Sequence, residues 1–227
     1  MIVYYGATRN LYPYLQGAIR SLLDHNDVSK LYIAAEDDKL PFEILCEHEV
    51  LNVSGQQYYK SNCPNLNSQF TYMAMMRACL PELIQEDKVL VLDVDTIVCD
   101  SLEPIWDIDL TGNWLAWCPE HFGNYKPYGP QYYNIGVAVM NLEQMRRDGF
   151  TDTAVALLNK IPFRYTDQCV FNILAVPNHS VDIDIRYNES FCCGFTDNPA
   201  VVHFAGFRNW YENRQMYRWE YLEKYMR

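Results

Sequence analysis

The sequence predicts an α/β protein with a mainly parallel central sheet flanked by helices. Short apolar runs alternate with segments of helical spacing through the first hundred residues, which is the pattern of parallel strands joined by helices. The run Lys88–Leu92 (KVLVL) is continuously apolar after its lysine, as in a strand buried on both faces. The 227 residues are 49% hydrophobic and 21% charged, so the chain can bury a substantial core.

The first half supports this fold class element by element. The apolar run Ile2–Tyr5 ends at Gly6–Thr8, a strand followed by a turn. The segment Leu11–Leu23 places its apolar residues on one helical face. The other elements expected here are strands at 30–35, 49–53 and 88–92 and a helix at 69–84 that is broken near Pro81.

The second half is less regular. Residues 119–130 are rich in Gly, Pro and Tyr and are expected to form a loop. No internal repeat or low-complexity linker interrupts the chain, so we expect one domain over 1–227 with a C-terminal helical segment at 210–227. The remaining expected elements are strands at 114–118, 135–140, 181–185 and 201–204 and helices at 143–159, broken near Gly149, and at 166–174.

The formal net charge of −11 argues against a duplex nucleic acid partner, because phosphate binding needs a basic face. An acidic protein that binds an anionic substrate must offset the repulsion locally, and a bound metal cation is the simplest way to do so. We therefore expect no nucleic acid partner and, for an anionic substrate, a metal.

The chain is expected to be cytoplasmic. Its N-terminus reads as a core strand rather than a secretory leader, and its eight cysteines, without a CxxC pair, suit a reducing compartment. No stretch approaches the ~20 apolar residues of a membrane span. The segment 210–227 mixes aromatic and basic residues, so peripheral membrane contact is possible, although a closing helix packed on the sheet is favoured.

The strongest local feature is the pair Asp93 and Asp95, directly after the apolar strand at 88–92. Ligands of open α/β sheets bind beyond the carboxyl ends of the strands, where two carboxylates at i and i+2 can turn toward one ion. Hard oxygen ligands suit magnesium or manganese. The alternative is a solvated acidic turn, but apolar residues on both sides place the pair in the core.

These residues carry a resemblance. The run KVLVLDVDTIV resembles the strand-plus-DxD signature of glycosyltransferases with the GT-A (Rossmann-like) fold, which implies a mixed, mainly parallel sheet. The chain also resembles the retaining enzymes of glycosyltransferase family 8, which includes bacterial galactosyltransferases and glycogenin. Four further segments carry that resemblance, in the family's order: IVYYGATRNLYPYLQGAIRSLL, YYNIGVAVMNL, TDQCVFN and VVHFAGFRNW.

The resemblance implies a metal and diphosphate site. Asp93, Asp95 and His203 would hold Mn²⁺, with Mg²⁺ possible, and an imidazole among oxygen ligands favours manganese over calcium. Gly206 and Arg208 would bind the diphosphate, although the lysine of the family pattern is missing and Arg208 stands one place early. A histidine at the end of an apolar strand can instead be an ordinary core residue.

The resemblance also implies a nucleotide site at the end of the first strand. Thr8 stands where the family has an aspartate that faces the base. A threonine can still hydrogen-bond a base edge, so uridine remains the expected base. The alternative is an ordinary turn with polar capping residues. The implied nucleotide-binding residues are Ala7, Thr8, Asn10, Asp93 and Val94.

The reacting centre is expected at Asp167 and Gln168, which are also donor-sugar contacts by the resemblance. An amide is a poor nucleophile, so we favour front-face transfer, in which the departing diphosphate helps to deprotonate the acceptor. Arg77 and Asn134 are further implied donor-sugar contacts. Arg77 can equally be a surface helix residue, Asn134 a strand-entry turn, and Thr166 the N-cap of a helix that starts beside Asp167.

Together these features predict a metal-dependent retaining hexosyltransferase that moves glucose or galactose from a UDP-sugar to a glycan, lipid-linked or protein acceptor. Residues 119–130 and the C-terminal segment are candidate lids that exclude water. One alternative is a haloacid-dehalogenase-like phosphatase, with Asp93 as nucleophile and Asp95 as acid/base. The other is a non-catalytic nucleotide-sugar binding protein of the same fold.

Overall fold

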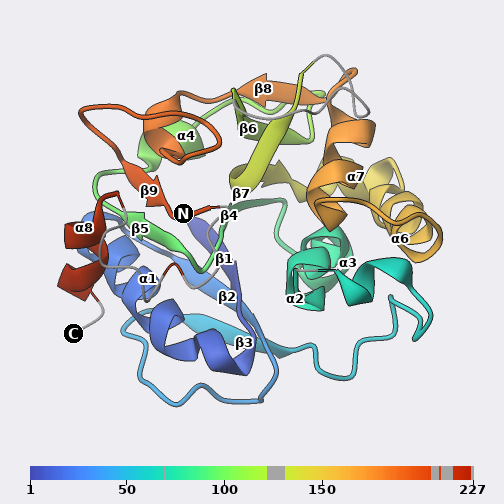
Figure 1. The fold of residues 1–227 in the computed structure, drawn as a ribbon, viewed down its shortest axis with the longest axis horizontal. Coiled ribbons are helices and arrows are strands. Elements are labelled where there is room, and N and C mark those ends of the chain that lie inside the picture. Colours follow the sequence, from blue (N-terminus) through green and yellow to red (C-terminus); the bar gives the residue numbers. More distant parts are fainter. Residues whose placement is uncertain (69, 122–130, 206–209, 211–216, 226–227) are drawn as a thin grey trace.

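The computed structural model describes residues 1–68, 70–121, 131–205, 210 and 217–225 (Figure 1). Its main sheet has seven strands in the order β3-β2-β1-β4-β7-β6-β8. Four of the neighbouring pairs are parallel, and β7 runs antiparallel to β4 and β6. The mixed, mainly parallel sheet is therefore confirmed. The strands are β1 Ile2–Gly6, β2 Lys30–Ala35, β3 His48–Asn52, β4 Lys88–Leu92, β6 Leu115–Pro119, β7 Tyr133–Asn141 and β8 Ser180–Asp182.

Helices flank the sheet, with α1 on one side and α2, α3, α6 and α7 on the other (Figure 1). Strand residues alternate between two cores: Val3 and Tyr5 join the core with α1, whereas Tyr4 joins the core with α5, α6 and α7. Burial on both faces explains why β1 and β4 read as continuous apolar runs. The helical elements are η1 Arg9–Leu11, α1 Tyr12–His25, η2 Pro64–Asn67, α2 Tyr72–Met75, η3 Met76–Cys79, α3 Leu80–Leu83, α4 Glu103–Trp106, α5 Leu142–Arg147, α6 Phe150–Lys160, α7 Thr166–Ala175, η5 Ile185–Tyr187 and α8 Trp219–Tyr225.

A second, two-stranded sheet pairs β5 (Thr96–Val98) with β9 (Val201–His203) in antiparallel orientation. Thr96 lies opposite His203, and the backbone N–H of Phe204 donates to the carbonyl of Asp95 at 2.9 Å. This small sheet holds the segment after β4 against a strand more than a hundred residues later. It packs on α1, where the Ser21 hydroxyl accepts from the Val98 N–H at 2.9 Å.

Several expected boundaries differ from the structure. The helix expected at 69–84 is three consecutive pieces. Its expected break near Pro81 is confirmed: η3 ends at Cys79 and α3 begins at Leu80, with Pro81 in the first turn of α3. The strand expected at 181–185 is β8, Ser180–Asp182, followed by η5. Within the described residues the tail expected to be helical from Trp210 onward contains one helix, α8. The break near Gly149 is confirmed: this glycine has φ of 65° between α5 and α6.

Among the residues that the structure describes, no helix combines the length and apolar character required to cross a bilayer.

Candidate metal centre and active site

The predicted ligand pair lies in the tight turn between β4 and β5. The Asp93 N–H donates to the carbonyl of Gly136 on β7 at 2.7 Å, and the Asp93 carbonyl accepts from the Thr96 N–H and hydroxyl. The turn directs both carboxylates toward the end of β9. There His203 Nε2 lies 3.3 Å from Asp95 Oδ1 and 3.8 Å from Asp93 Oδ2.

Asp93, Asp95 and His203 fit a divalent cation. One ligand atom from each can be chosen so that all three lie within 4.8 Å of one another. Adjacent ligands at about 2.1 Å from an octahedral ion are about 3 Å apart, close to the separations seen at His203. Two carboxylates and one imidazole suit manganese, and the oxygen ligands alone suit magnesium.

Gly136 makes room for this cluster. A Cβ atom at position 136 would lie 2.1 Å from His203 Cε1 and 2.8 Å from Asp93 Oδ2. Both separations are far shorter than normal contacts, so only glycine lets β7 pass this close to the ligands.

Arg77 is buried and connects Asp93, in the candidate metal cluster, to Asp167 on α7. Its Nη1 donates to Asp93 Oδ1 at 2.6 Å, and its Nε donates to Asp167 Oδ2 at 2.8 Å. The alternative of a surface helix residue is therefore wrong. Asp93 divides its two oxygens between Arg77 and the side facing His203. Two carboxylates, Asp93 and Asp167, share the one guanidinium, and Asp95 adds a third carboxylate beside them, so a divalent cation would offset the excess of acidic groups.

Asp167, Asp95 and His203 have shifted pKa values. Burial raises the pKa of Asp167 above the usual range of a carboxyl, and the Arg77 charge offsets only part of this effect. Burial also acts to raise the pKa of Asp95, but the neighbouring His203 outweighs it and the net direction is downward. For His203, burial favours the neutral ring, yet Asp95 outweighs burial and raises the pKa. The contact between these two groups thus favours the ionised carboxylate and the protonated ring.

A chain of polar side chains continues behind His203. Its Nδ1 is 2.8 Å from Asn188 Oδ1, and Asn188 Nδ2 donates to Asn134 Oδ1 at 3.0 Å. Asn134 Oδ1 also accepts from the Gly136 N–H at 2.9 Å, and Asn134 Nδ2 donates to Glu120 Oε1 at 2.9 Å. Asn134 lies within β7, so the strand-entry turn is wrong.

Gln168 joins the same network beside Asp167 at the start of α7. Its Nε2 donates to Glu120 Oε1 at 3.1 Å, and its Oε1 accepts from the Ile135 N–H at 3.3 Å. Protein groups therefore hold the amide at both ends. Thr166 does not cap the helix as the alternative interpretation supposed: with φ of 40° it is the first helical residue, and its hydroxyl donates to Asp167 Oδ1 at 2.9 Å.

The expected nucleotide residues follow β1 at the same edge of the sheet, because β1 is parallel to β4. The Ala7 N–H donates to the Ala34 carbonyl, and the Thr8 hydroxyl donates to Asn10 Oδ1 at 2.7 Å. Thr8 precedes η1 without capping it through its side chain. Val94, between the two aspartates, packs partly buried against the core that includes α1.

Two expected residues cannot be placed: Gly206 and Arg208 lie outside the described residues. The same holds for most of the proposed lid, since 122–130 is also outside them. Conversely, the sequence reasoning missed Glu120 and Asn188. Glu120 was included in an expected loop, and Asn188 stands between two short elements with no motif around it, so neither position carried a usable signal.

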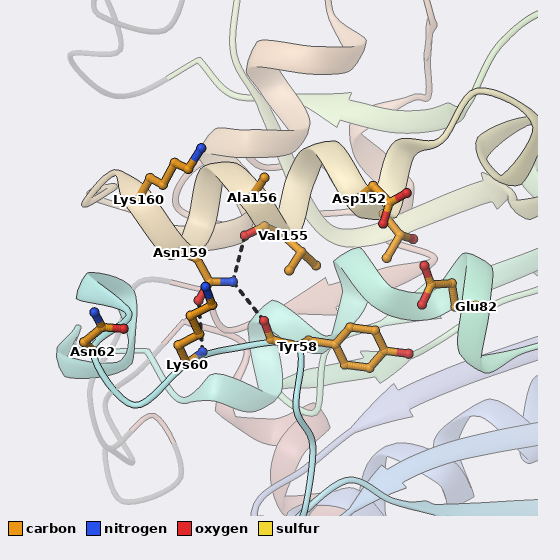
Figure 2. A pocket seen from close by; sticks show the side chains of 10 residues that line it. Tyr58, Lys60, Asn62, Glu82, Asp152, Val155, Ala156, Asn159 and Lys160 are labelled. Atoms are coloured by element: carbon orange, nitrogen blue, oxygen red, sulfur yellow. Dashed lines mark hydrogen bonds between the residues drawn. The ribbon is translucent and has the colours of Figure 1, made fainter.

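A separate cavity of about 420 Å³ lies between the segment around Tyr58 and α6, and Figure 2 shows its lining. The Tyr58 ring lies along it with Glu82 and Asp152 near its hydroxyl end, and Lys60 lies toward the other end. None of its lining residues belongs to the network around Asp93. The chemistry predicted from the sequence is therefore located elsewhere.

Comparisons with known proteins all find glycosyltransferases. Glycosyl transferase family 8 matches residues 2–214. Glycosyltransferase GlyB of Streptococcus pneumoniae is 26% identical over 220 residues, which are 92% of this chain and 52% of GlyB. Glycosyltransferase GlyA of the same organism is 25% identical over 210 residues, 86% of this chain and 28% of GlyA. The chain thus spans about half the length of GlyB and less of GlyA.

Solved structures share the fold. The galactosyltransferase LgtC, in complex with donor and acceptor sugar analogs, has a TM-score of 0.76 at 20% identity, covering 100% of this chain and 95% of that one. Glycosyltransferase GlyE of Streptococcus pneumoniae has a TM-score of 0.66 at 20% identity, covering 98% of this chain and 62% of that one.

Proposed function

The chain belongs to glycosyl transferase family 8, and we propose that it moves a hexose, glucose or galactose, from a UDP-sugar to an acceptor with retention of configuration. The resemblance found in the sequence and the GT-A fold are both confirmed by this membership and by the likeness to LgtC. The observation that carries the proposal is the placement of Asp93, Asp95 and His203 around one point beside the buried pair Arg77 and Asp167.

A divalent cation, Mn²⁺ or Mg²⁺, is proposed at Asp93, Asp95 and His203, where it would supply positive charge to the donor diphosphate. Arg77 holds Asp93 by one oxygen, which leaves the other facing the ion site. Gly206 and Arg208 remain the proposed diphosphate contacts, and Ala7, Thr8, Asn10 and Val94 the proposed nucleotide contacts. The acceptor, a glycan, a lipid-linked sugar or a protein, is unassigned.

Asp167 and Gln168 are the proposed centre of the reaction. Arg77 orients the Asp167 carboxylate, which can then accept from hydroxyls of the donor sugar. Gln168 is held at both ends by Glu120 and Ile135, so its amide is a fixed polar surface rather than a nucleophile. This supports front-face transfer without a covalent intermediate. Asn134, whose oxygen already has two donors, contributes through Glu120 and Asn188 more than through the sugar.

The proposal is tested by incubating the protein with a panel of nucleotide sugars and Mn²⁺ and measuring free nucleotide. We expect release from UDP-glucose or UDP-galactose, and loss of release with a chelator. Asp95→Asn removes a ligand and is expected to lower the rate at least ~100-fold. The matched control is Asp152→Asn, an exposed carboxylate on α6, which should keep the wild-type rate.

Two outcomes would contradict the proposal. Saturable donor binding without nucleotide release would indicate the non-catalytic binding protein, and full activity of Asp95→Asn would show that the pair holds no essential ion. The phosphatase alternative is wrong, because the chain belongs to family 8.

A further inference from the structure

Asn188 occupies an unusual position behind the metal cluster. It is fully buried at 0% exposure, directly after η5, and its side chain bridges His203 and Asn134. Its oxygen meets Nδ1 of His203, whereas Nε2 is the nitrogen that faces Asp93 and Asp95. Its amide therefore acts on the far nitrogen of the imidazole.

A backbone group fixes the direction of every hydrogen bond in this chain. The N–H of Gly136 can only donate, so the Asn134 atom that it meets must be the carbonyl oxygen. Asn188 must then present its NH₂ to that oxygen and its own carbonyl oxygen to His203. The other end agrees, since the NH₂ of Asn134 meets a carboxylate oxygen of Glu120.

The imidazole consequently has no choice of tautomer. An oxygen acceptor at 2.8 Å from Nδ1 requires that Nδ1 carry the proton, so the neutral ring has its lone pair on Nε2. Nε2 is the nitrogen that lies 3.3 Å from Asp95 Oδ1 and 3.8 Å from Asp93 Oδ2. The opposite tautomer would place two acceptors, Nδ1 and Asn188 Oδ1, against each other in a buried space.

We propose that Asn188 is a positioning residue that locks His203 in the Nδ1–H tautomer and so directs the Nε2 lone pair at the cation site. The part of this inference that concerns the cation rests on the proposed function; the tautomer itself does not. Partners of this kind orient a ligating histidine, and their loss typically weakens metal binding about 10–100-fold.

The first experiment uses ¹⁵N-labelled protein without metal or donor. Long-range ¹H–¹⁵N spectra at alkaline pH, where the ring carries one proton, identify the protonated nitrogen, and the signal of His203 is the one absent from His203→Gln. We expect Nδ1–H in the wild type and in Asn188→Asp, which keeps an oxygen acceptor for Nδ1 while giving up the donor to Asn134. Asn188→Ala is expected to contain the Nε2–H form.

The second experiment measures Mn²⁺ affinity by electron paramagnetic resonance of the free ion. Asn188→Ala is expected to bind Mn²⁺ about 10–100-fold more weakly. The control is Asn65→Ala, which removes another buried amide. The Asn65 side chain has three backbone partners and lies away from His203. This variant should lose stability while keeping the wild-type tautomer and affinity.

The inference is overturned if Asn188→Ala keeps the Nδ1–H tautomer or the wild-type Mn²⁺ affinity. Should Asn188→Ala fail to fold, Asn188→Asp still decides: an Nε2–H ring in that variant also overturns it. Failure of the proposed function looks different, since it would appear as a locked tautomer and tight Mn²⁺ binding with no nucleotide release from any donor.

Discussion

Gly136 lies where any side chain would collide with His203 and Asp93, two residues of the proposed cation site. The atoms nearest to a methyl group at this position would be ring and carboxylate atoms of His203 and Asp93, both of which are held by further hydrogen bonds. Neither can move away without giving up a partner. The site therefore depends on the absence of one methyl group.

We predict that Gly136→Ala displaces His203 or Asp93 and lowers the rate of nucleotide release about 100-fold, the scale of a misplacement of about 1 Å. Stability should fall by about 1–3 kcal/mol through overpacking. The matched control is Gly55→Ala, because a methyl group there meets nothing within 4 Å. Steady-state kinetics and thermal unfolding of both variants test this, and a fully active Gly136→Ala would contradict it.

Single residues could be predicted from the sequence where both the residue type and its position at the end of a strand indicated the same role. Asp93 and Asp95 follow a buried strand and could be recognised from that alone, whereas the role of Arg77 was ambiguous because η3 gives no helical face to read. Glu120 and Asn188 could not be found, since a hydrogen-bond chain across three elements leaves no spacing in the sequence.

The pairing of β5 with β9 is the element that brings the ligands together. Hydrogen bonds of the ladder set Thr96 opposite His203, so the register of two three-residue strands determines where the imidazole lies. Such short strands contribute few bonds, and α1 reinforces them through Ser21. That hydroxyl also donates to the Ala18 carbonyl at 2.7 Å.

We predict that Ser21→Ala lowers the free energy of unfolding by about 1–3 kcal/mol, because it leaves the buried Val98 N–H without its acceptor. Thr153→Ala removes an exposed hydroxyl from α6 and should change stability by no more than about 0.5 kcal/mol. Denaturant unfolding of the two variants checks the difference, and equal stabilities would show that Ser21 does not support β5.

Element types were predictable and boundaries less so. The break expected near Pro81 is the junction of η3 and α3, which leaves Pro81 in the first turn of α3, where its missing N–H costs nothing. The strand at 135–140 was expected, yet its antiparallel direction was not readable, because an apolar run buried on both faces looks the same in either orientation. Only the resemblance implied a mixed sheet.

The whole molecule carries a net charge of −11, and the repulsion between acidic groups is strong where Asp93, Asp95 and Asp167 lie close together. The neighbouring carboxylate of Asp95 raises the pKa of His203, so the two groups favour opposite charges and part of the local repulsion is offset. The raised pKa of His203 then contributes stability that is complete below its unfolded value of about 6.5 and is lost as pH rises through the folded pKa. The lowered pKa of Asp95 matters only at acidic pH, so His203 dominates near neutrality.

We predict that Mn²⁺ raises the midpoint of thermal unfolding more at about pH 9 than at about pH 6, because the ion competes with a proton for Nε2 of His203. Thermal scans at the two pH values with and without Mn²⁺ measure this. His203→Gln is the control. In this variant Mn²⁺ should raise the midpoint of thermal unfolding only slightly, and by the same amount at both pH values. Equal increments in the wild type would mean that the imidazole takes no part in binding the ion.

The small sheet of β5 and β9 also bears on how the protein is made. Asp93 and Asp95 leave the ribosome more than a hundred residues before His203. At a synthesis rate of about 5–20 residues per second, His203 is added roughly 5–20 s after the two aspartates. During that interval β6, β7 and β8 are synthesised, but the strand that β5 pairs with is still missing. The residues of the proposed ion site are thus complete only after all seven strands of the main sheet have been synthesised.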